Sequence, residues 1–160
     1  MRFERWVTAF QPAVFRAAYL ILRDRSGAED VAQETFIRAF HALERSDPGD
    51  GVRPWLYRIA VNTALNELRR RKRESAAYSR VAPSDQADPA ADPETRSIVA
   101  DAIDKLPDHL RIPVICRYYL DLSEAEMARV LRIRPGTVKS RLHLARKALA
   151  GDENLAVVNG

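Results

Sequence analysis

A segment rich in Pro, Ala and Asp divides this chain into two parts. It runs from Ser75 to Pro93 with the sequence SAAYSRVAPSDQADPAADP, and it holds three prolines. It shows neither the apolar period of a helix nor that of a strand, and structureless loops longer than about 12 to 15 residues are uncommon within compact domains. We therefore expect a flexible linker at residues 75–94 between two small domains, residues 1–74 and 95–150, followed by a tail at 151–160. A long loop inside a single domain is the alternative.

Apolar residues recur at helical spacing on both sides of this linker. Strong turn chemistry from Asp47 to Gly51 interrupts the pattern once. We therefore expect an all-α fold, with a helical bundle before the linker and, after it, helices over residues 95–106 and 111–120, with Pro113 in the first turn of the second. The expected core stripes are Val14, Ala17, Ala18, Ile21 and Leu22, then Ala32, Phe36, Phe40 and Leu43, then Trp55, Ile59, Asn62, Leu65 and Leu68.

Several classes of protein are excluded by what the sequence lacks. No apolar run approaches the roughly 20 residues that span a bilayer, and the start lacks the apolar core of a secretory signal, so we expect a cytoplasmic protein with no membrane insertion. The single cysteine, Cys116, permits no internal disulfide or thiolate cluster and is expected to be buried. Because no P-loop, GxSxG motif or paired metal ligands occur, we expect no enzyme activity, no metal and no other cofactor.

The distribution of charge is more informative than the modest net charge of +4. Between Val52 and Arg73 lie seven basic residues and one acid, Glu67, and between Arg129 and Lys147 lie seven basic residues and no acid. The stretch from Ser84 to Asp104 is acidic instead. Two separate basic helices favour two contact sites on DNA.

The second basic segment has the pattern of a helix-turn-helix. Ser123 to Glu126 form a capping box that predicts the start of a short helix. Arg132 to Arg134 then turn the chain, and Pro135 is suited to open the next helix, whose N-terminal half would face base edges in the major groove. A solvated helix with ordinary surface charge is the alternative. The candidate duplex-reading residues are Thr137, Lys139, Ser140, Arg141 and His143.

The first basic segment, VRPWLYRIAVNTALNELRRRKR, combines aromatic rings with cations. Rings can stack on separated bases but not on the bases of an intact duplex, so this helix is a candidate site for single strands. The alternative is that Trp55 belongs to the core and the arginines are solvated. Asn62 falls on the expected apolar stripe, where its amide either anchors the adjacent loop or faces a bound base. The candidate strand-binding residues are Arg53, Trp55, Arg58, Asn62, Arg69 and Arg70.

Taken together, these segments resemble the extracytoplasmic-function (ECF) group of bacterial sigma factors, the two-domain promoter-specificity subunits of RNA polymerase in the sigma-70 family. AEDVAQETFIRAF resembles the core-binding helix of region 2.2, and WLYRIAVNTALNELRRRKR resembles region 2.4. LPDHLRIPVICRYYLDLSEAEMARVLRIRPGTVKSRLHLARKAL resembles region 4. The resemblance implies that the first domain is region 2, for polymerase binding and recognition of the −10 element, and that the second is region 4, for recognition of the −35 element.

The resemblance also implies partners and residue roles. Asp30, Gln33 and Glu34 would contact the coiled coil of the β′ subunit of core RNA polymerase, and Asn62 with the Ser46–Val52 loop would hold a flipped base of an opened −10 element. The second basic helix would read the −35 element as duplex. The β subunit, promoter DNA and an anti-sigma factor are further implied partners.

Two residues depart from the commonest pattern of the family. Leu144 stands where arginine is frequent, and Arg134 precedes the second basic helix where a small capping residue is usual. The alternative function is a conventional helix-turn-helix regulator that binds only duplex DNA.

Overall fold

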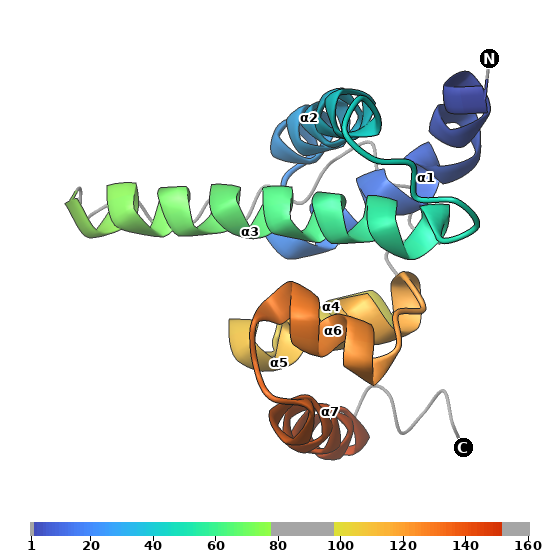
Figure 1. The fold of residues 1–160 in the computed structure, drawn as a ribbon. Coiled ribbons are helices and arrows are strands. Elements are labelled where there is room, and N and C mark those ends of the chain that lie inside the picture. The colour runs from blue at the N-terminus through green and yellow to red at the C-terminus, as the bar shows by residue number, and fades with distance from the viewer. Residues whose placement is uncertain (1, 78–97, 152–160) are drawn as a thin grey trace. The chain divides into compact units, whose positions relative to one another are not determined.

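The computed structural model describes residues 2–77 and 98–151, and every regular element within them is a helix (Figure 1). The chain divides into two compact units, Met1–Ala87 and Asp88–Gly160. The expected all-α fold of two small helical domains is confirmed. The predicted linker at 75–94 and the predicted tail at 151–160 lie almost wholly outside the described residues, so these boundaries stay predictions. Within the described part, no helix is long and apolar enough to cross a membrane.

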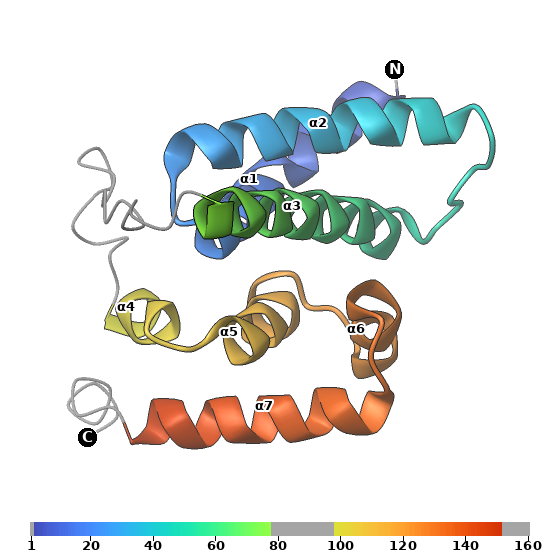
Figure 2. The ribbon, with the colours of Figure 1, turned by 90° about the vertical axis from the view of Figure 1, so that its left-hand side faces the viewer.

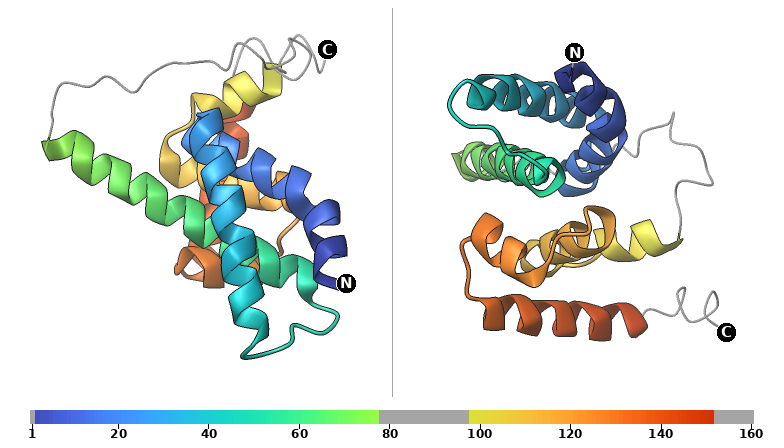
Figure 3. Two further views of the ribbon diagram at one scale, coloured as in Figure 1. Left: turned by 90° about the horizontal axis from the view of Figure 1, so that it is seen from above. Right: turned by 45° about the vertical axis from the view of Figure 1, so that its right-hand side comes forward.

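The first unit consists of three helices, each packed against the other two: α1 (Arg2–Leu22), α2 (Arg25–Leu43) and α3 (Val52–Ala77). A short connection at Arg23 and Asp24 returns α2 along α1, as Figure 2 shows. The last turns of α3 extend beyond the other two helices (Figure 3, left). The first expected core stripe, Val14 to Leu22, is confirmed because its five members are all buried.

The other two expected stripes are partly wrong. Phe40 is 47% exposed, because it lies at the open edge of α2 beside Phe3, whose ring centroid is 5.4 Å away. On α3, Trp55 and Asn62 are only half-buried. Since α3 packs against two helices, its buried face is wide and is centred one position further along than the stripe we expected. The buried residues of that face are Leu56, Tyr57, Ala60, Val61, Thr63, Ala64 and Leu65.

The second unit contains α4 (Ile98–Asp104), α5 (Asp108–Val114), the π-helix η1 (Ile115–Tyr119), α6 (Glu124–Leu131) and α7 (Pro135–Ala150). The expected helix at 111–120 begins earlier, at Asp108, so Pro113 lies inside it and not in its first turn. Proline has no N–H to donate to the preceding turn, and two residues later the helix widens to the π form. Cys116 is fully buried there as expected, and burial raises the pKa of its thiol to about 12.

The helix-turn-helix prediction is confirmed at its caps. The Ser123 hydroxyl oxygen accepts a hydrogen bond from the amide of Glu126 at 3.1 Å, and the Ser123 amide donates to the Glu126 carboxylate at 3.3 Å. At the other end of α6, Arg132 adopts a left-handed conformation with φ of 56°, and Pro135 opens α7. Val138, Leu142 and Ala145 are buried, so one face of α7 is held against the unit.

We expect Ser123→Ala to destabilise the second unit selectively. Loss of an N-cap hydroxyl costs about 1 kcal/mol of unfolding free energy. Both tryptophans, Trp6 and Trp55, belong to the first unit, so in urea denaturation the far-UV circular dichroism reports both units and tryptophan fluorescence reports the first. Ser123→Ala should therefore lower the urea midpoint of the second unit, which only circular dichroism reports. The fluorescence transition of the first unit should stay where it is.

Ser140→Ala is the matched control, since this serine is exposed on α7 and caps no helix. An equal shift of both signals in Ser123→Ala would contradict the independence of the two units.

Candidate nucleic-acid interface

The face of α7 opposite its packed stripe carries the residues predicted to read duplex DNA. Lys139, Ser140 and His143 are exposed, while Thr137 and Arg141 are half-buried beside them. No acidic residue occurs in α7. The carboxylate of Glu124 comes within 4.0 Å of the Lys139 ammonium group, but that lysine side chain is 70% exposed, so water screens the pair strongly. The N-terminal half of α7 therefore presents donors and positive charge together.

Not every basic residue of α7 is available to DNA. The Arg146 Nε donates a hydrogen bond to the Tyr118 hydroxyl at 2.7 Å, and its guanidinium lies 5.9 Å from the centre of the same ring. Arg146 thus fastens α7 to η1. This pairing was not predicted, because it joins residues 28 positions apart. The helical period relates only residues that are close in sequence, so it does not indicate that Tyr118 lies beside α7.

The rings of α3 are used mainly inside the protein. Tyr57 is buried, with its ring edge-to-face against Phe10 at 5.8 Å, and its burial raises the pKa of the phenol. Trp55 is half-buried and meets Trp6 edge-to-face at 6.3 Å. Tyr57 therefore belongs to the core, whereas Trp55, for which the core alternative was raised, keeps part of its surface open. Asn62 lies at the margin of the core, so its amide is not a fully buried group that must be hydrogen-bonded inside the protein.

Acidic residues offset much of the positive charge at the end of α3. The Arg70 guanidinium binds the carboxylates of Glu67 and Glu74, and hydrogen bonding from Arg70 lowers the pKa of Glu67. Arg71 binds Glu67 at 3.0 Å and also Asp24, at the start of α2, at 2.6 Å. Counting charge along α3 alone missed Asp24, which is distant in sequence. The Arg70 side chain itself is 51% exposed, and Arg58 and Arg69 are exposed as well.

The loop between α2 and α3 has a defined shape. The Asp47 carboxylate accepts a hydrogen bond from the Gly49 amide at 2.8 Å and pairs with Arg2 of α1 at 3.0 Å. The Gly49 amide is the main cause of the lowered pKa of Asp47. Gly49 itself has a φ of 61°, a conformation that favours glycine. The loop predicted to hold a flipped base is therefore tied to the N-terminus of α1.

The outer face of α2 carries the three residues predicted to contact polymerase. Asp30 and Gln33 are exposed, and half-buried Glu34 pairs with Arg38 at 2.9 Å. The opposite face is packed through Val31, Thr35 and Ala39. The structure thus leaves these three side chains at the surface.

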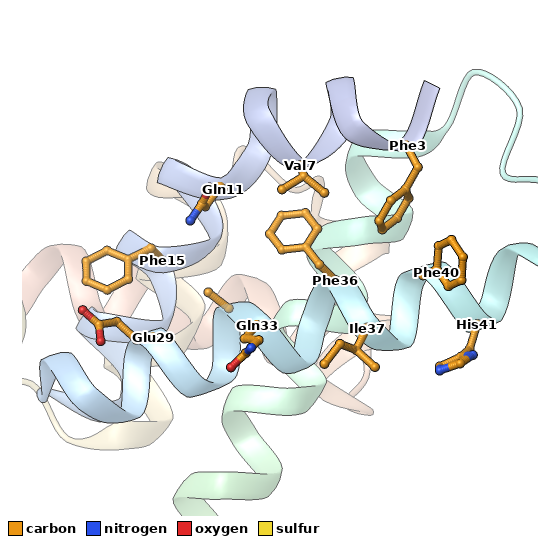
Figure 4. Close-up of a pocket in the computed structure, with 11 residues that line it drawn as sticks. Phe3, Val7, Gln11, Phe15, Glu29, Gln33, Phe36, Ile37, Phe40 and His41 are labelled. Carbon is orange, nitrogen blue, oxygen red and sulfur yellow. The ribbon is translucent and has the colours of Figure 1, made fainter. Parts of the chain in front are cut away.

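An open groove of about 760 Å³ between α1 and α2 adjoins this face (Figure 4). Ile37 and Phe40 line it and are both nearly half-exposed. Apolar surface that is gathered in one place marks binding sites for other proteins. The sequence did not predict the groove, because the helical period places Phe40 in the core. The lining residues are Phe3, Val7, Gln11, Phe15, Glu29, Ala32, Gln33, Phe36, Ile37, Phe40 and His41.

Several sigma factors are similar to this chain in sequence. SigW of Bacillus subtilis (strain 168), an ECF RNA polymerase sigma factor, is 31% identical over 89% of this chain and 84% of its own length. The RNA polymerase sigma-H factor of Pseudomonas aeruginosa is 32% identical over 92% and 83%. The ECF RNA polymerase sigma factor SigE of Mycolicibacterium smegmatis is 36% identical over 85% and 55%.

Two solved structures are similar in fold. The sigma factor RpoE of Bartonella quintana, in complex with the anti-sigma factor NepR, superposes with a TM-score of 0.79 at 24% identity and covers 98% of each chain. CnrH, in complex with the cytosolic domain of CnrY, superposes with a TM-score of 0.64 at 27% identity and covers 92% of this chain and 84% of its own.

Family models match the two units separately. The model of Sigma-70 region 2 matches residues 6–74, which span α1 to α3 apart from their outermost residues. The model of Sigma-70, region 4 matches residues 96–149, which contain the helix-turn-helix. With these two matches and a relative such as SigW aligned over most of both chains, this chain belongs to the ECF sigma factors of the sigma-70 family.

Proposed function

We propose that this chain is a dissociable subunit of RNA polymerase that binds the core enzyme and directs it to specific promoters. The observation that carries the proposal is the presence of a region 2 unit and a region 4 unit in one chain, each with its own exposed basic helix. Such a subunit acts by binding and positioning DNA and does no covalent chemistry itself. It would work in the cytoplasm, where promoter DNA lies.

In this proposal α7 reads the −35 element as duplex. Its exposed N-terminal half offers Lys139, Ser140, Arg141 and His143 as donors to base edges and phosphates. Thr137 lies in the first turn, where it can reach the backbone. The acid-free composition of α7 suits a surface that approaches a polyanion closely.

The outward face of α3, with the loop before it, would hold the −10 element as separated strands. Asn62 and the exposed part of Trp55 lie on the same helix as Arg53, Arg58, Arg69 and Arg70. Capture of a base that has left the stack offsets an unstacking cost of a few kcal/mol. A regulator that binds only duplex DNA has no use for such a site, and the region 2 match argues against that alternative.

Core polymerase would bind α2 and the adjoining groove. Gln33 belongs both to the exposed polar face with Asp30 and Glu34 and to the wall of the groove. A polar face that continues into apolar surface has the composition of a protein interface, with an apolar centre and a polar rim. We infer that the coiled coil of β′ lies on this combined surface.

A protein inhibitor is a further proposed partner. CnrH and the Bartonella sigma factor were each solved in complex with a second protein, CnrY and the anti-sigma factor NepR respectively. We infer that an anti-sigma factor also binds this chain.

Transcription in vitro tests the central proposal. Core polymerase with this chain should initiate at promoters that core polymerase alone ignores, and this chain alone should give no transcript. Failure of the chain to bind core polymerase in a pull-down would end the proposal.

Replacement of Asn62 by Ala should slow promoter opening by about tenfold or more, the effect of losing hydrogen bonds to a base worth about 1 to 3 kcal/mol, and should leave closed-complex formation nearly unchanged. Permanganate reactivity of unpaired thymines measures opening, and a filter-binding assay at low temperature measures the closed complex. Asn66→Ala, one turn further along the exposed face of α3, is the matched control. Equal losses in both assays would indicate a structural role for Asn62.

Lys139→Gln and Arg141→Gln should each weaken binding of the holoenzyme to duplex −35 DNA. Each should also reduce the slope of log affinity against log salt by about 0.9, because one fewer counterion is released. Fluorescence anisotropy across a salt series measures both quantities. Arg146→Gln, the same change on the same helix, should alter the slope less, because Tyr118 holds that guanidinium. An unchanged slope in the first two variants would place those residues outside the interface.

Phe40→Ser should weaken binding of core polymerase by about tenfold or more and lower the melting temperature only modestly, through the lost contact with Phe3. The reason is that Phe40 is 47% exposed in the free chain, so a partner can still bury nearly half of its apolar surface. Surface plasmon resonance with immobilised core enzyme measures the affinity. Val99→Ser removes a comparably exposed apolar side chain from α4 and is the control. Equal affinity of Phe40→Ser and the unaltered chain would exclude the groove from the interface.

A further inference from the structure

An ion pair joins the far end of α3 to the beginning of α2. The Arg71 Nη2 lies 2.6 Å from the Asp24 Oδ2, and the two side chains are only about one-third exposed, at 34% and 29%. The other oxygen of the same carboxylate accepts a hydrogen bond from the Gly27 amide at 2.8 Å and caps α2. Asp24 therefore serves the N-terminus of α2 and Arg71 simultaneously.

Because Gly27 has no side chain, the Asp24–Arg71 pair can occupy the space beside it. A Cβ atom at this position would lie 2.2 Å from the Arg71 Nη2 and 2.5 Å from the Asp24 Oδ2, both far below contact distance. Glycine in a helix costs about 1 kcal/mol relative to alanine, so its presence in the first turn of α2 is unfavourable for the helix alone. The close approach of the Arg71 guanidinium explains why a glycine occupies this position.

Arg71 also uses a second nitrogen of its guanidinium. Its Nε binds the Glu67 carboxylate at 3.0 Å, one turn earlier on α3. The guanidinium thus bridges two carboxylates, one at the N-cap of α2 and one on α3, through two nitrogens fixed in one plane, whereas lysine offers a single ammonium nitrogen.

The position of the Asp24–Arg71 pair along α3 lets the pair influence the direction of the end of this helix. Leu65 is the last buried apolar residue of α3, and residues 72–76 are all exposed. Apolar packing therefore holds the first half of α3, and the Asp24–Arg71 pair lies beyond its end. In sequence, Asp24 comes less than two turns before Asp30, where the proposed polymerase-binding face begins.

We propose that Arg71 is a positioning residue that sets the direction of the DNA-binding end of α3 relative to the polymerase-binding helix, and that it is not itself a DNA contact. The Asp24–Arg71 pair, with Gly27 as the space it requires, couples polymerase binding on α2 to the placement of separated strands on α3. This inference rests on the proposed function and adds to it the residue that connects its two surfaces.

The rival role for Arg71 is a direct phosphate contact, as its place in a basic run suggests. The two roles differ in their tolerance of lysine. A lysine serves a phosphate well as a point charge, but it cannot pair with Asp24 and Glu67 together. The two roles also differ in salt dependence, because only a phosphate contact releases a counterion. Loss of one such contact on single-stranded DNA changes the slope of log affinity against log salt by about 0.7.

The test uses holoenzyme on a promoter that the unaltered holoenzyme selects from genomic fragments, and it measures the rate constant of opening and its salt slope. The variants are Asp24→Asn, Arg71→Gln, their double variant, Arg71→Lys and Gly27→Ala. Asparagine caps a helix as well as aspartate does, so Asp24→Asn removes the charge and keeps the cap. Gly27→Ala adds helix propensity while crowding both the guanidinium and the Asp24 carboxylate, so it disrupts the pair without removing either charge.

We expect each single variant to slow opening by about three- to tenfold, as is usual when a coupled pair is broken. The double variant should be no slower than either parent, Arg71→Lys should be as slow as Arg71→Gln, and the salt slope should be unchanged throughout. Arg73→Gln, which removes the same charge two residues later, should combine additively with Asp24→Asn.

Three results would overturn the inference: additive losses in Asp24→Asn and Arg71→Gln, normal opening by Arg71→Lys with a reduced slope in Arg71→Gln, or normal opening by every variant. A holoenzyme that selects and opens no promoter even with the unaltered chain would instead overturn the proposed function.

Discussion

The close approach of α1 and α2 to α3 is the constraint on which the region 2 unit depends. The buried face of α3 includes Ala60 and Ala64, whose small side chains allow two helices to pack against one. Packing against two neighbouring helices buries a wide part of the α3 surface, including the ring of Tyr57. The polar residues left over, such as Arg58 and Asn62, share the remaining sector, so one helix holds the unit together and presents the proposed strand-binding surface.

In the region 4 unit, interactions between residues close in sequence set the geometry. Its reading helix has to be held at a fixed angle to α6, and short-range features do this: the Ser123 capping box, the left-handed Arg132 and Pro135 at the first position of α7. Within the described part of this unit, the side-chain hydrogen bond from Arg146 to Tyr118 adds a contact between residues far apart in sequence. A short sequence motif can therefore carry most of the geometry of a duplex reader.

This contrast explains how much could be predicted from the sequence. Caps, turns and periodic stripes depend on neighbours within one or two helical turns, so α6, α7 and the core stripe of α1 were predicted correctly. Phe40 was misplaced because its exposure depends on how the first turn of α1 packs beside it, and the pairing of Arg71 with Asp24 depends on how α2 and α3 are placed. The centre of the buried face of α3 was likewise set by two partners that its own period does not reveal. Roles for individual DNA-binding residues, whether inferred from the charge pattern or implied by the family resemblance, stay predictions.

The half-exposed pair of Ile37 and Phe40 has a cost for the chain when it is alone. Apolar surface kept ready for a partner also adheres to other copies of the same chain and to unrelated proteins. We therefore expect the solubility of the free subunit to fall as its concentration rises, and any protein that covers the groove to act as a solubilising chaperone as well as a competitor. The balance between free and covered groove would then govern the lifetime of the chain in addition to its access to polymerase.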